Sequence, residues 1–237
     1  MRETQNLSQL IDEVLLNFKD FVDERRYMNM EGFSAYVKKP DRYFYRYRKI
    51  EALLRLTRKY HKEGDVILDV GCGVGVPLIV AAHFFGNVVG FDVNRNVTSI
   101  LKRYIDFHKI DAGNLAGSIM RIPVRTMCAD IVWCLDVLEH LKDPELAILG
   151  VRKVLKPNGY MIISLPVENY LTRVSKKMLK LGARGHYTGS IKTLPEMFRM
   201  LRKHFYLVEM ETIPDWLPLT FAFSVLAVFL NRKGSRP

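Results

Sequence analysis

The sequence has 237 residues, of which 49% are hydrophobic and 26% are charged, a balance that excludes a largely disordered chain. Its formal net charge is +11, which suits nucleic acid, an anionic membrane surface or an acidic substrate and does not choose among them. The three cysteines form no CxxC pair, so we expect reduced thiols rather than a disulfide framework or a zinc site. The charged N-terminus lacks the apolar core of a signal peptide, which favours a cytoplasmic protein.

Two helices are predicted before the first strand. Residues 7–27 place apolar side chains at steps of three and four, the pattern of an amphipathic helix with one buried face. Pro40 and Asp41 are typical of a helix start, and residues 42–60 also follow a helical period. We expect these helices to form an N-terminal helical cap over residues 1–62.

From residue 63 the sequence alternates between short apolar runs and helical patterns. The expected strands are VILDV (66–70), NVVGFDV (87–93), AGSIM (116–120), ADIVWCLDV (129–137), YMIISLP (160–166), FYLVEMETI (205–213) and SVLAVFLNRK (224–233). Helices are expected over 77–85 and 97–110 and after Asp143–Pro144, with LKPNG (155–159) as a turn. This alternation predicts an α/β fold, a doubly wound Rossmann-like sheet of seven mostly parallel strands.

The loop after the first of these strands reads DVGCGVG and opens at the sheet edge where doubly wound folds bind ligands. A dinucleotide fingerprint would need a small third residue, where this chain has Val76. Asp69 would also repel a pyrophosphate, which disfavours an NAD-dependent oxidoreductase. It suits instead a positively charged ligand group. Asp92 follows Gly71 by 21 residues, an offset typical of a ribose hydroxyl acceptor. S-adenosylmethionine combines these features.

Five stretches, in this order, resemble signatures of the class I S-adenosylmethionine-dependent methyltransferases: VILDVGCGVG, VVGFDVN, IPV, ADIVWCLDVLEHLKDPE and LKPNGYMIISLP. The resemblance covers about residues 66–166. By its DVLEHL stretch, the chain is most similar to the ubiquinone/menaquinone-biosynthesis-like small-molecule methyltransferases. The resemblance implies a single methyltransferase domain over residues 1–237. In it, residues 63–166 form the cofactor-binding core, 167–204 a basic helical insertion or lid, and 205–237 the final strand pair.

The resemblance also implies which residues contact the methionine end of S-adenosylmethionine. The backbone around Gly71, Cys72 and Gly73 would approach that end, and Asp69 would act on the ammonium directly or through water. Arg48, on the helix ahead of the first strand, matches a position that can pair with the ligand carboxylate. The alternative for Arg48 is an ordinary solvated helix face.

The nucleoside end involves a second group of residues. By the same resemblance, Asp92 would hold both ribose hydroxyls and Val93 would pack on the adenine. The Ile119 backbone would address a ring nitrogen, and the Cys134 backbone would bind the ammonium. Ser118 stands where the family often has an acid, so its hydroxyl would bond the adenine amino group and the cofactor affinity would be lower.

Two histidines are candidate catalytic bases for a hydroxyl acceptor. His140 follows the fourth strand directly, and the alternative is that it braces the helix after it. His186 lies in a glycine-rich stretch that could cover the pocket, and the alternative is a merely exposed side chain. Asp136, Glu139 and His140 resemble an ExxEH cluster with which some quinone O-methyltransferases hold a divalent cation. The first acid is one methylene shorter here, and we expect no metal.

We expect the acceptor to be a small or lipid-like molecule methylated on oxygen or carbon. Nucleic acid is disfavoured because no Asn/Asp-Pro-Pro-aromatic motif follows the fourth strand, although an RNA or protein methyltransferase stays open. A non-catalytic S-adenosylmethionine-binding protein also stays open. Residues 171–184 combine basic and apolar side chains and, together with the apolar stretch 214–224, could contact a membrane peripherally. Residues 216–230 are too short for a membrane span, and we expect a buried loop and strand there. The sequence gives no signal for an oligomeric state.

Overall fold

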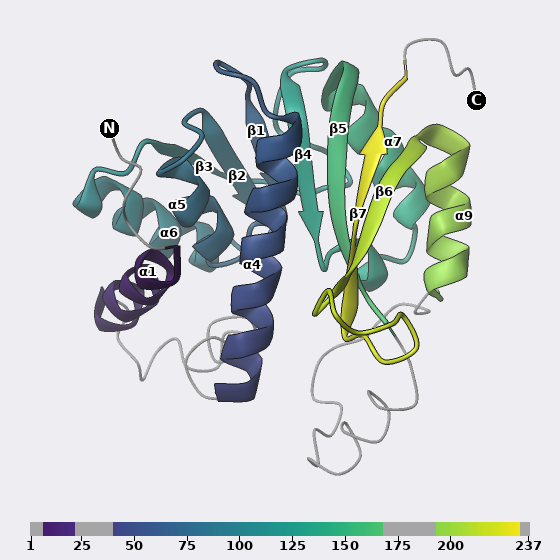
Figure 1. Ribbon diagram of the computed structural model, residues 1–237. Helices are drawn as coiled ribbons and strands as arrows, with labels where there is room; N and C mark the ends of the chain where they lie inside the picture. Colours follow the sequence, from purple (N-terminus) through teal and green to yellow (C-terminus); the bar gives the residue numbers. More distant parts are fainter. Residues whose placement is uncertain (1–6, 22–39, 168–192, 233–237) are drawn as a thin grey trace. The chain divides into compact units, whose positions relative to one another are not determined.

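The computed structural model describes residues 7–21, 40–167 and 193–232 (Figure 1). The chain divides into two compact units, residues 1–123 and 124–237. Together their seven strands make a mostly parallel sheet with flanking helices, so the expected doubly wound, Rossmann-like α/β fold is confirmed. The division of the chain into cap, core, insertion and strand pair stays a prediction.

The first unit begins with the two expected helices, α1 (Leu7–Phe21) and α4 (Pro40–Tyr60). On α1 the buried side chains recur at steps of one and three: Leu10, Ile11 and Val14. This face packs on α5 (Val76–Ala82), beside which α1 lies in Figure 1. The spacing of apolar residues therefore identified the buried side of α1 correctly.

Three parallel strands form the sheet of the first unit. They are β1 (Ile67–Val70), β2 (Val88–Asp92) and β3 (Ala112–Ala116), in the order β3-β2-β1. Helix α6 (Arg95–His108) connects β2 to β3 and contacts both strands. All four residues of β1 are buried, as expected for a parallel strand covered on both faces.

The second unit contains the other four strands, in the order β4-β5-β7-β6. Strand β4 (Ala129–Leu135) pairs in parallel with β5 (Leu155–Pro166). Strand β7 (Ser224–Leu230) lies between β5 and β6 (Tyr206–Ile213), antiparallel to both. The two strands expected over 205–213 and 224–233 are thus present as β6 and β7.

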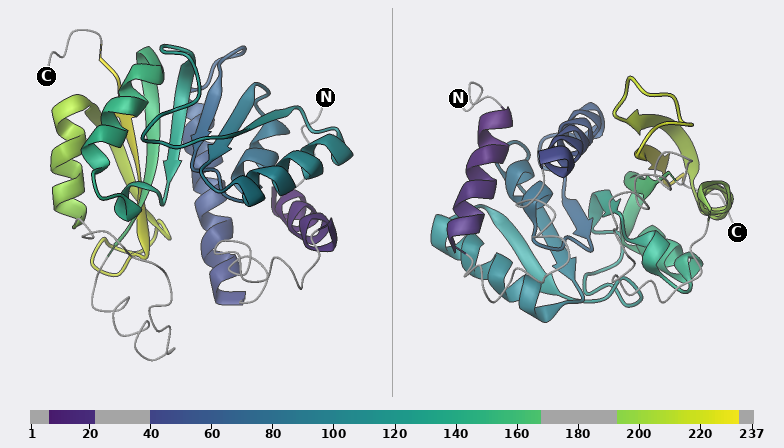
Figure 2. Two further views of the ribbon diagram at one scale, coloured as in Figure 1. Left: turned by 180° about the vertical axis from the view of Figure 1, so that it is seen from behind. Right: turned by 90° about the horizontal axis from the view of Figure 1, so that it is seen from below.

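The helices of this unit are a short 3₁₀ turn η1 (Leu138–His140), α7 (Pro144–Val154) and α9 (Leu194–His204). Helices α7 and α9 lie side by side, as Figure 2 shows. Asp143 caps α7 by accepting a hydrogen bond from the N–H of Leu146 at 3.2 Å, which explains why the Asp-Pro pair predicted this helix start. Across the described stretches no helix is both long and apolar enough to cross a membrane.

Two sequence-based boundaries were wrong. The third strand is Ala112–Ala116, not residues 116–120. The side-chain amide of Asn114 donates to the carbonyl of Thr98 at 2.5 Å and ties this strand to α6. The expected strand residues instead enter a turn, in which the N–H of Arg121 donates to the carbonyl of Ser118 at 2.9 Å.

The stretch LKPNG was expected to be a turn, but it is the first part of β5. Asn158 adopts a left-handed backbone with φ of 62°, within the stretch where the register between β4 and β5 shifts. The segment after β7 stays hydrogen-bonded to β5 here, because the N–H of Asn158 donates to the carbonyl of Asn231 at 2.8 Å. Composition indicated irregular backbone at this position, but the turn that it predicted is part of a strand.

The loop over residues 214–223 was expected to be buried and is not. Large apolar side chains project from it into solvent, at Trp216, Leu219, Phe221 and Phe223. The strand that follows is buried from Ser224 to Phe229, as expected. An apolar run in a sequence does not distinguish residues that pack inside from residues that lie on the surface.

Candidate functional site

The turn that follows β1 is built from glycines in left-handed backbone. Gly71, Gly73 and Gly75 have φ of 75°, 53° and 75°, a region that other residues rarely adopt. A Cβ atom added to Gly73 would meet no atom within 4 Å, so open space lies over this part of the turn. A Cβ on Gly75 would instead lie 2.5 Å from a side-chain carbon of Leu101. Gly73 thus leaves room for a ligand, whereas Gly75 is required by packing.

Asp92, at the end of β2, holds this turn in place. One carboxylate oxygen accepts a hydrogen bond from the N–H of Gly73 at 3.0 Å, and the other accepts from the N–H of Asn94 at 2.8 Å. The side chain of Asn94 in turn caps α6 by accepting from two N–H groups of its first turn. Each oxygen keeps a second lone pair, so the carboxylate can also accept from a ligand diol.

The start of the turn is fixed by the backbone of β2. The N–H groups of Gly71 and Cys72 both donate to the carbonyl of Phe91, at 2.8 and 3.0 Å. The Cys72 side chain is buried, and burial together with the charges of Asp69 and Asp92 raises the pKa of its thiol well above the usual value. Cys72 is therefore a neutral packing residue at this turn, and only its backbone can serve a ligand.

Asp69 lies under the turn and is only 2% exposed. Burial, followed by the nearby charge of Asp92, raises the pKa of the Asp69 carboxyl to about 7. With a pKa near 7 this carboxyl is partly protonated at neutral pH, and a nearby positive charge favours its ionised form. The pair of acids beside bare backbone fits a ligand that carries both a positive group and a ribose diol, which is the chemistry of S-adenosylmethionine.

The residues expected around the adenine take different positions in the first unit. Val93 is 73% exposed, which leaves its side chain available to a ring. Ser118 and Ile119 follow β3, and Ile119 is buried. The hydroxyl of Ser118 accepts from the N–H of Met120 at 3.2 Å, so it already stabilises the local turn. The N–H of Gly117 donates to the carbonyl of Asp92 at 2.9 Å and connects this turn to the end of β2.

Arg48 lies on α4 and forms an ion pair with Glu51, with 2.9 Å between the nitrogen and oxygen atoms. Both side chains are a little over one third exposed. The expected role of Arg48 toward a ligand carboxylate stays a prediction. For that role Arg48 would have to leave Glu51 or bind both carboxylates.

In the second unit the end of β4 carries the other expected residues. Cys134 is fully buried within the strand, so its backbone alone could contact a ligand. Asp136 follows with a left-handed φ of 54°. Its carboxylate accepts from the hydroxyl of Ser164 on β5 at 2.6 Å, and its N–H donates to the carbonyl of the same serine at 3.2 Å. These two bonds join the carboxyl ends of β4 and β5.

His140 ends the 3₁₀ turn after this strand, and its side chain is exposed whereas that of Glu139 is buried. The N–H of His140 donates to the carbonyl of Val137 at 3.1 Å, a bond that shapes the turn. No group of three metal-ligating side chains occurs among the residues with described positions. The expectation that Asp136, Glu139 and His140 hold no metal stays a prediction. His186 lies outside the described residues.

Two contributors were missed by the sequence analysis. Asn94 stabilises the turn next to Asp92, and an asparagine directly before a helical pattern is a recognisable cap signal. Ser164 holds Asp136 from the neighbouring strand, and no local pattern in the sequence announces this pairing. Both residues orient groups at the carboxyl edge of the sheet.

Comparison with known proteins supports the resemblance to methyltransferases. The profile of a family described as a methyltransferase domain matches residues 68–163. This stretch contains the glycine turn, Asp69, Asp92 and the end of β4. Residues 68–163 therefore match a methyltransferase domain, in agreement with the class I, S-adenosylmethionine-dependent type that the sequence resembles. The cofactor of such a methyltransferase domain is S-adenosylmethionine, and the resemblance deduced from the five sequence stretches is confirmed.

Among curated relatives, the methyltransferase domain is similar to the ubiquinone biosynthesis O-methyltransferase of Hydrogenovibrio crunogenus, with 30% identity over 53% of this chain and 55% of the relative. The protein of the same name from Cupriavidus pinatubonensis is 29% identical over 68% of each chain. The matches thus span between about half and two thirds of these relatives. The magnesium protoporphyrin IX methyltransferase of Synechocystis, solved with bound SAH, shares the fold with a TM-score of 0.67 at 17% identity, over 88% of this chain and 98% of that one.

Proposed function

We propose that this protein transfers a methyl group from S-adenosylmethionine to an oxygen or carbon atom of a small, lipid-like or quinone-like acceptor. The observation that carries the proposal is the carboxylate pair at the glycine turn, where Asp69 is buried with a raised pKa and Asp92 is hydrogen-bonded to Gly73. The relatives named for ubiquinone biosynthesis support the acceptor class.

When bound, S-adenosylmethionine supplies an electrophilic methyl carbon on a sulfonium. Asp69 stabilises the positive charge of the ligand, and Asp92 accepts from the ribose hydroxyls while it holds the glycine turn. Much of the rate enhancement in such an in-line displacement comes from positioning the two reactants. The chain contributes to positioning through the glycine turn after β1, which is hydrogen-bonded to the end of β2.

For a hydroxyl acceptor, we propose His140 as the general base. The imidazole of His140 would take the hydroxyl proton as the acceptor oxygen receives the methyl group, and the products would be the methylated acceptor and S-adenosylhomocysteine. The His140 side chain is exposed at a strand end and is therefore accessible to an acceptor, and histidine is the residue that most often serves as a general base.

The first test is calorimetric titration with S-adenosylmethionine, S-adenosylhomocysteine and, as a control, NAD. We expect binding of the first two in the micromolar range and none of NAD. Incubation with S-adenosylmethionine and a panel of phenols, catechols and prenylated quinols should then give methylated product and S-adenosylhomocysteine in equal amounts. Cofactor binding without methyl loss on any acceptor would favour the alternative of a non-catalytic binding protein.

A further inference from the structure

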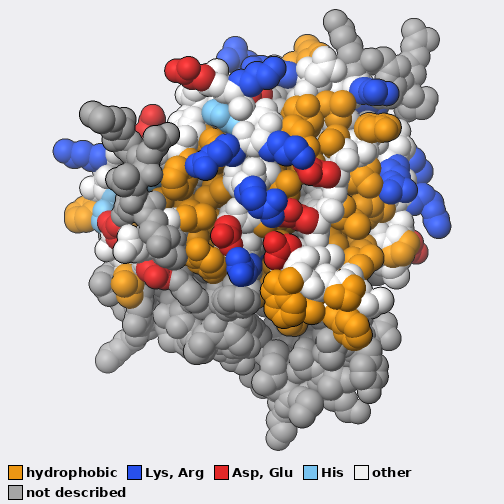
Figure 3. Space-filling view, in the orientation of Figure 1, with side chains coloured by type: hydrophobic (Ala, Val, Ile, Leu, Met, Phe, Trp, Pro, Cys, Tyr) orange, Lys and Arg blue, Asp and Glu red, His pale blue; other side chains and the backbone are white. Residues whose placement is uncertain are grey.

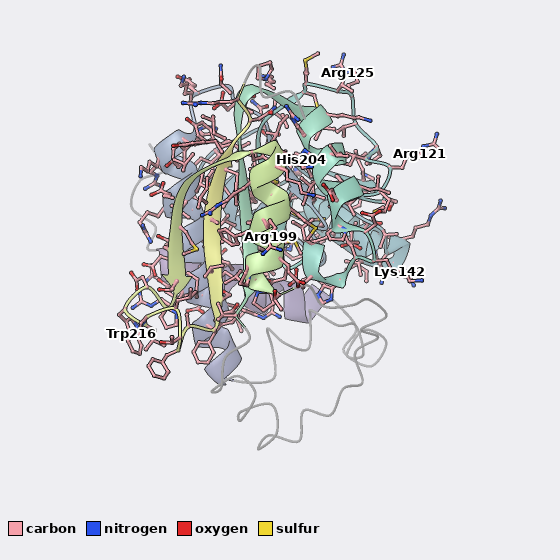
Figure 4. The ribbon with its side chains drawn as sticks, turned by 90° about the vertical axis from the view of Figure 1, so that its right-hand side faces the viewer. Arg121, Arg125, Lys142, Arg199, His204 and Trp216 are labelled. Carbon is pink, nitrogen blue, oxygen red and sulfur yellow. The ribbon has the colours of Figure 1, made fainter. Side chains whose placement is uncertain are left out.

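The loop between β6 and β7 carries an unusual concentration of exposed apolar side chains. Trp216 is 67% exposed, Phe221 48%, Phe223 45% and Leu219 40%. Figure 3 shows hydrophobic side chains gathered where this loop lies, and Figure 4 shows Trp216 at its outer end, away from α9. Such clusters of exposed large side chains usually mark an interaction site rather than chance exposure.

The loop is a built structure, because hydrogen bonds hold it from both ends and from within. The hydroxyl of Thr212 donates to the carbonyl of Leu217 at 2.8 Å. The N–H groups of Phe221 and Ala222 donate to the carbonyl of Pro218 at 2.9 and 3.0 Å. The N–H of Phe223 donates to the carbonyl of Ile213 at 3.0 Å. The exposed rings are therefore presented by a fixed backbone, which lowers the entropic cost of binding through them.

The position of the loop in the second unit relates it to the acceptor side. Strand β5 ends at Pro166, which pairs with Ser224 at the start of β7, and Ser224 also pairs with Ile213 at the end of β6. The loop thus leaves the sheet at the carboxyl end of β5. Asp136, after the carboxyl end of β4, is bonded to Ser164 at this same edge. The apolar rings and the β4 turn belong to one edge of the sheet.

Charge favours one partner over others. The whole chain has a net charge of +11, and the sequence that continues from β5, residues 168–192, contains six lysine or arginine residues against one glutamate. This stretch begins next to Val167, whose N–H donates to the carbonyl of Phe223 at 3.0 Å. Exposed aromatic rings on a chain with a strong net positive charge match the apolar boundary and the negative surface of an anionic lipid bilayer.

We propose that residues 214–223 form a membrane-docking loop whose rings insert into the surface of an anionic bilayer. The docking proposal rests on the proposed function, because it assumes that the acceptor is a lipid-like molecule that resides in the membrane. Docking through this loop turns the carboxyl edge of β4 and β5 toward the lipid, so that an apolar acceptor reaches the enzyme without crossing water. The binding combines ring insertion with attraction between basic residues and anionic headgroups.

The test uses the full chain and vesicles of phosphatidylcholine, with or without phosphatidylglycerol. The chain has two tryptophans, and Trp133 is fully buried, so a change in emission on binding reports on Trp216. We expect co-sedimentation with the anionic vesicles, a shift of emission to shorter wavelength, and quenching by lipids brominated on their acyl chains. Trp216→Phe should keep the binding and lose the spectral change.

The double variant Trp216→Ser/Phe221→Ser should weaken vesicle binding by about ten- to a hundredfold, since each ring contributes through its buried apolar area. The matched control is Phe107→Ser, which removes a 71% exposed ring from α6 and should leave vesicle binding unchanged. Titration with S-adenosylhomocysteine shows that each variant is folded and tests the proposed function separately.

Three results would overturn the docking proposal. The wild type could stay in solution with both kinds of vesicle, or the double variant could bind as tightly as the wild type. The loop could also prove to be a contact between copies, in which case sedimentation velocity without lipid would show a dimer that the double variant dissociates. A chain that binds vesicles through the loop but does not bind S-adenosylhomocysteine would instead contradict the proposed function alone.

Discussion

The carboxylate of Asp92 accepts a hydrogen bond from the backbone N–H of Gly73 at 3.0 Å, across 19 residues of sequence. The side chain expected to bind the ribose thus also fixes the turn expected to carry the methionine end. Ligand binding and the order of the turn are therefore coupled through one residue. A change at Asp92 should affect both ends of the cofactor.

Asp92→Ala should weaken S-adenosylmethionine binding by about tenfold or more, since a charge-assisted hydrogen bond and the anchor of Gly73 are lost together. Asp92→Asn keeps one accepting oxygen, so its affinity for S-adenosylmethionine should lie between that of Asp92→Ala and that of the wild type. Calorimetry measures both affinities. An unchanged affinity in Asp92→Ala would remove this residue from the cofactor site.

The raised pKa of Asp69, about 7, predicts that binding depends on pH. The ammonium group of the ligand favours the carboxylate, so the affinity for S-adenosylhomocysteine should rise as the pH increases through about 7, with release of a proton on binding. Titrations in buffers of different ionisation enthalpy count that proton. Asp69→Asn should bind S-adenosylhomocysteine more weakly and without release of a proton. If the wild type released no proton on binding, the assignment of Asp69 to the ligand ammonium would be contradicted.

The same pKa has a consequence for folding. Because the folded-state pKa of Asp69 lies above its unfolded value of 3.8, the folded state holds the proton more tightly. The contribution to stability is complete below the unfolded pKa and is lost as the pH rises through the folded pKa. Urea unfolding of wild type and Asp69→Asn between these two values should show a steeper loss of stability with pH in the wild type.

His140→Ala should lower the turnover of a hydroxyl acceptor by about 10²- to 10⁴-fold, the usual contribution of a general base. Cofactor affinity should not change, because the imidazole is assigned to the acceptor. His108→Ala, at the exposed end of α6, is the control and should retain full activity. Retained activity in His140→Ala would make this histidine a structural residue of the 3₁₀ turn.

Gly75→Ala and Gly64→Ala form a matched pair for stability. Both glycines have left-handed backbone, with φ of 75° and 85°, but an added Cβ meets Leu101 at Gly75 and nothing within 4 Å at Gly64. Leu101 is fully buried, so its side chain has little room to shift. Each variant should lose about 1–2 kcal/mol to the backbone, and Gly75→Ala about 1–3 kcal/mol more to overpacking. Equal losses by urea unfolding would contradict the packing role of Leu101.

Much of the fold could be predicted because its signals are local. Apolar periodicity marked α1 and α4, and the Asp143–Pro144 pair marked the start of α7. The third strand was misplaced because AGNLA has almost no apolar pattern, and its position depends on pairing with β2 and on the bond from Asn114 to Thr98. Such tertiary pairing overrides weak local preference.

The candidate site was predictable in its residue types more than in its contacts. The spacing of Asp69, the glycines and Asp92 pointed to a cofactor with a cation and a ribose. The bonds from Asp92 to Gly73 and from Ser164 to Asp136 join residues that are distant in sequence, and no period or motif encodes them. The exposure of the 214–223 loop was missed for a related reason, since hydrophobicity alone does not say which residues find a partner inside the chain.

The placement of β7 between β5 and β6 has a consequence for biosynthesis. Strand β5 is complete at Pro166, but its outer neighbour begins only at Ser224, 58 residues later by subtraction of these two positions. At about 5–20 residues per second, a ribosome needs on the order of 3–12 s to supply it. During that interval the open side of β5 is an unpaired strand edge, which is prone to aggregation. The nascent second unit should therefore recruit chaperones at this stage of translation, before β7 is available to close the sheet.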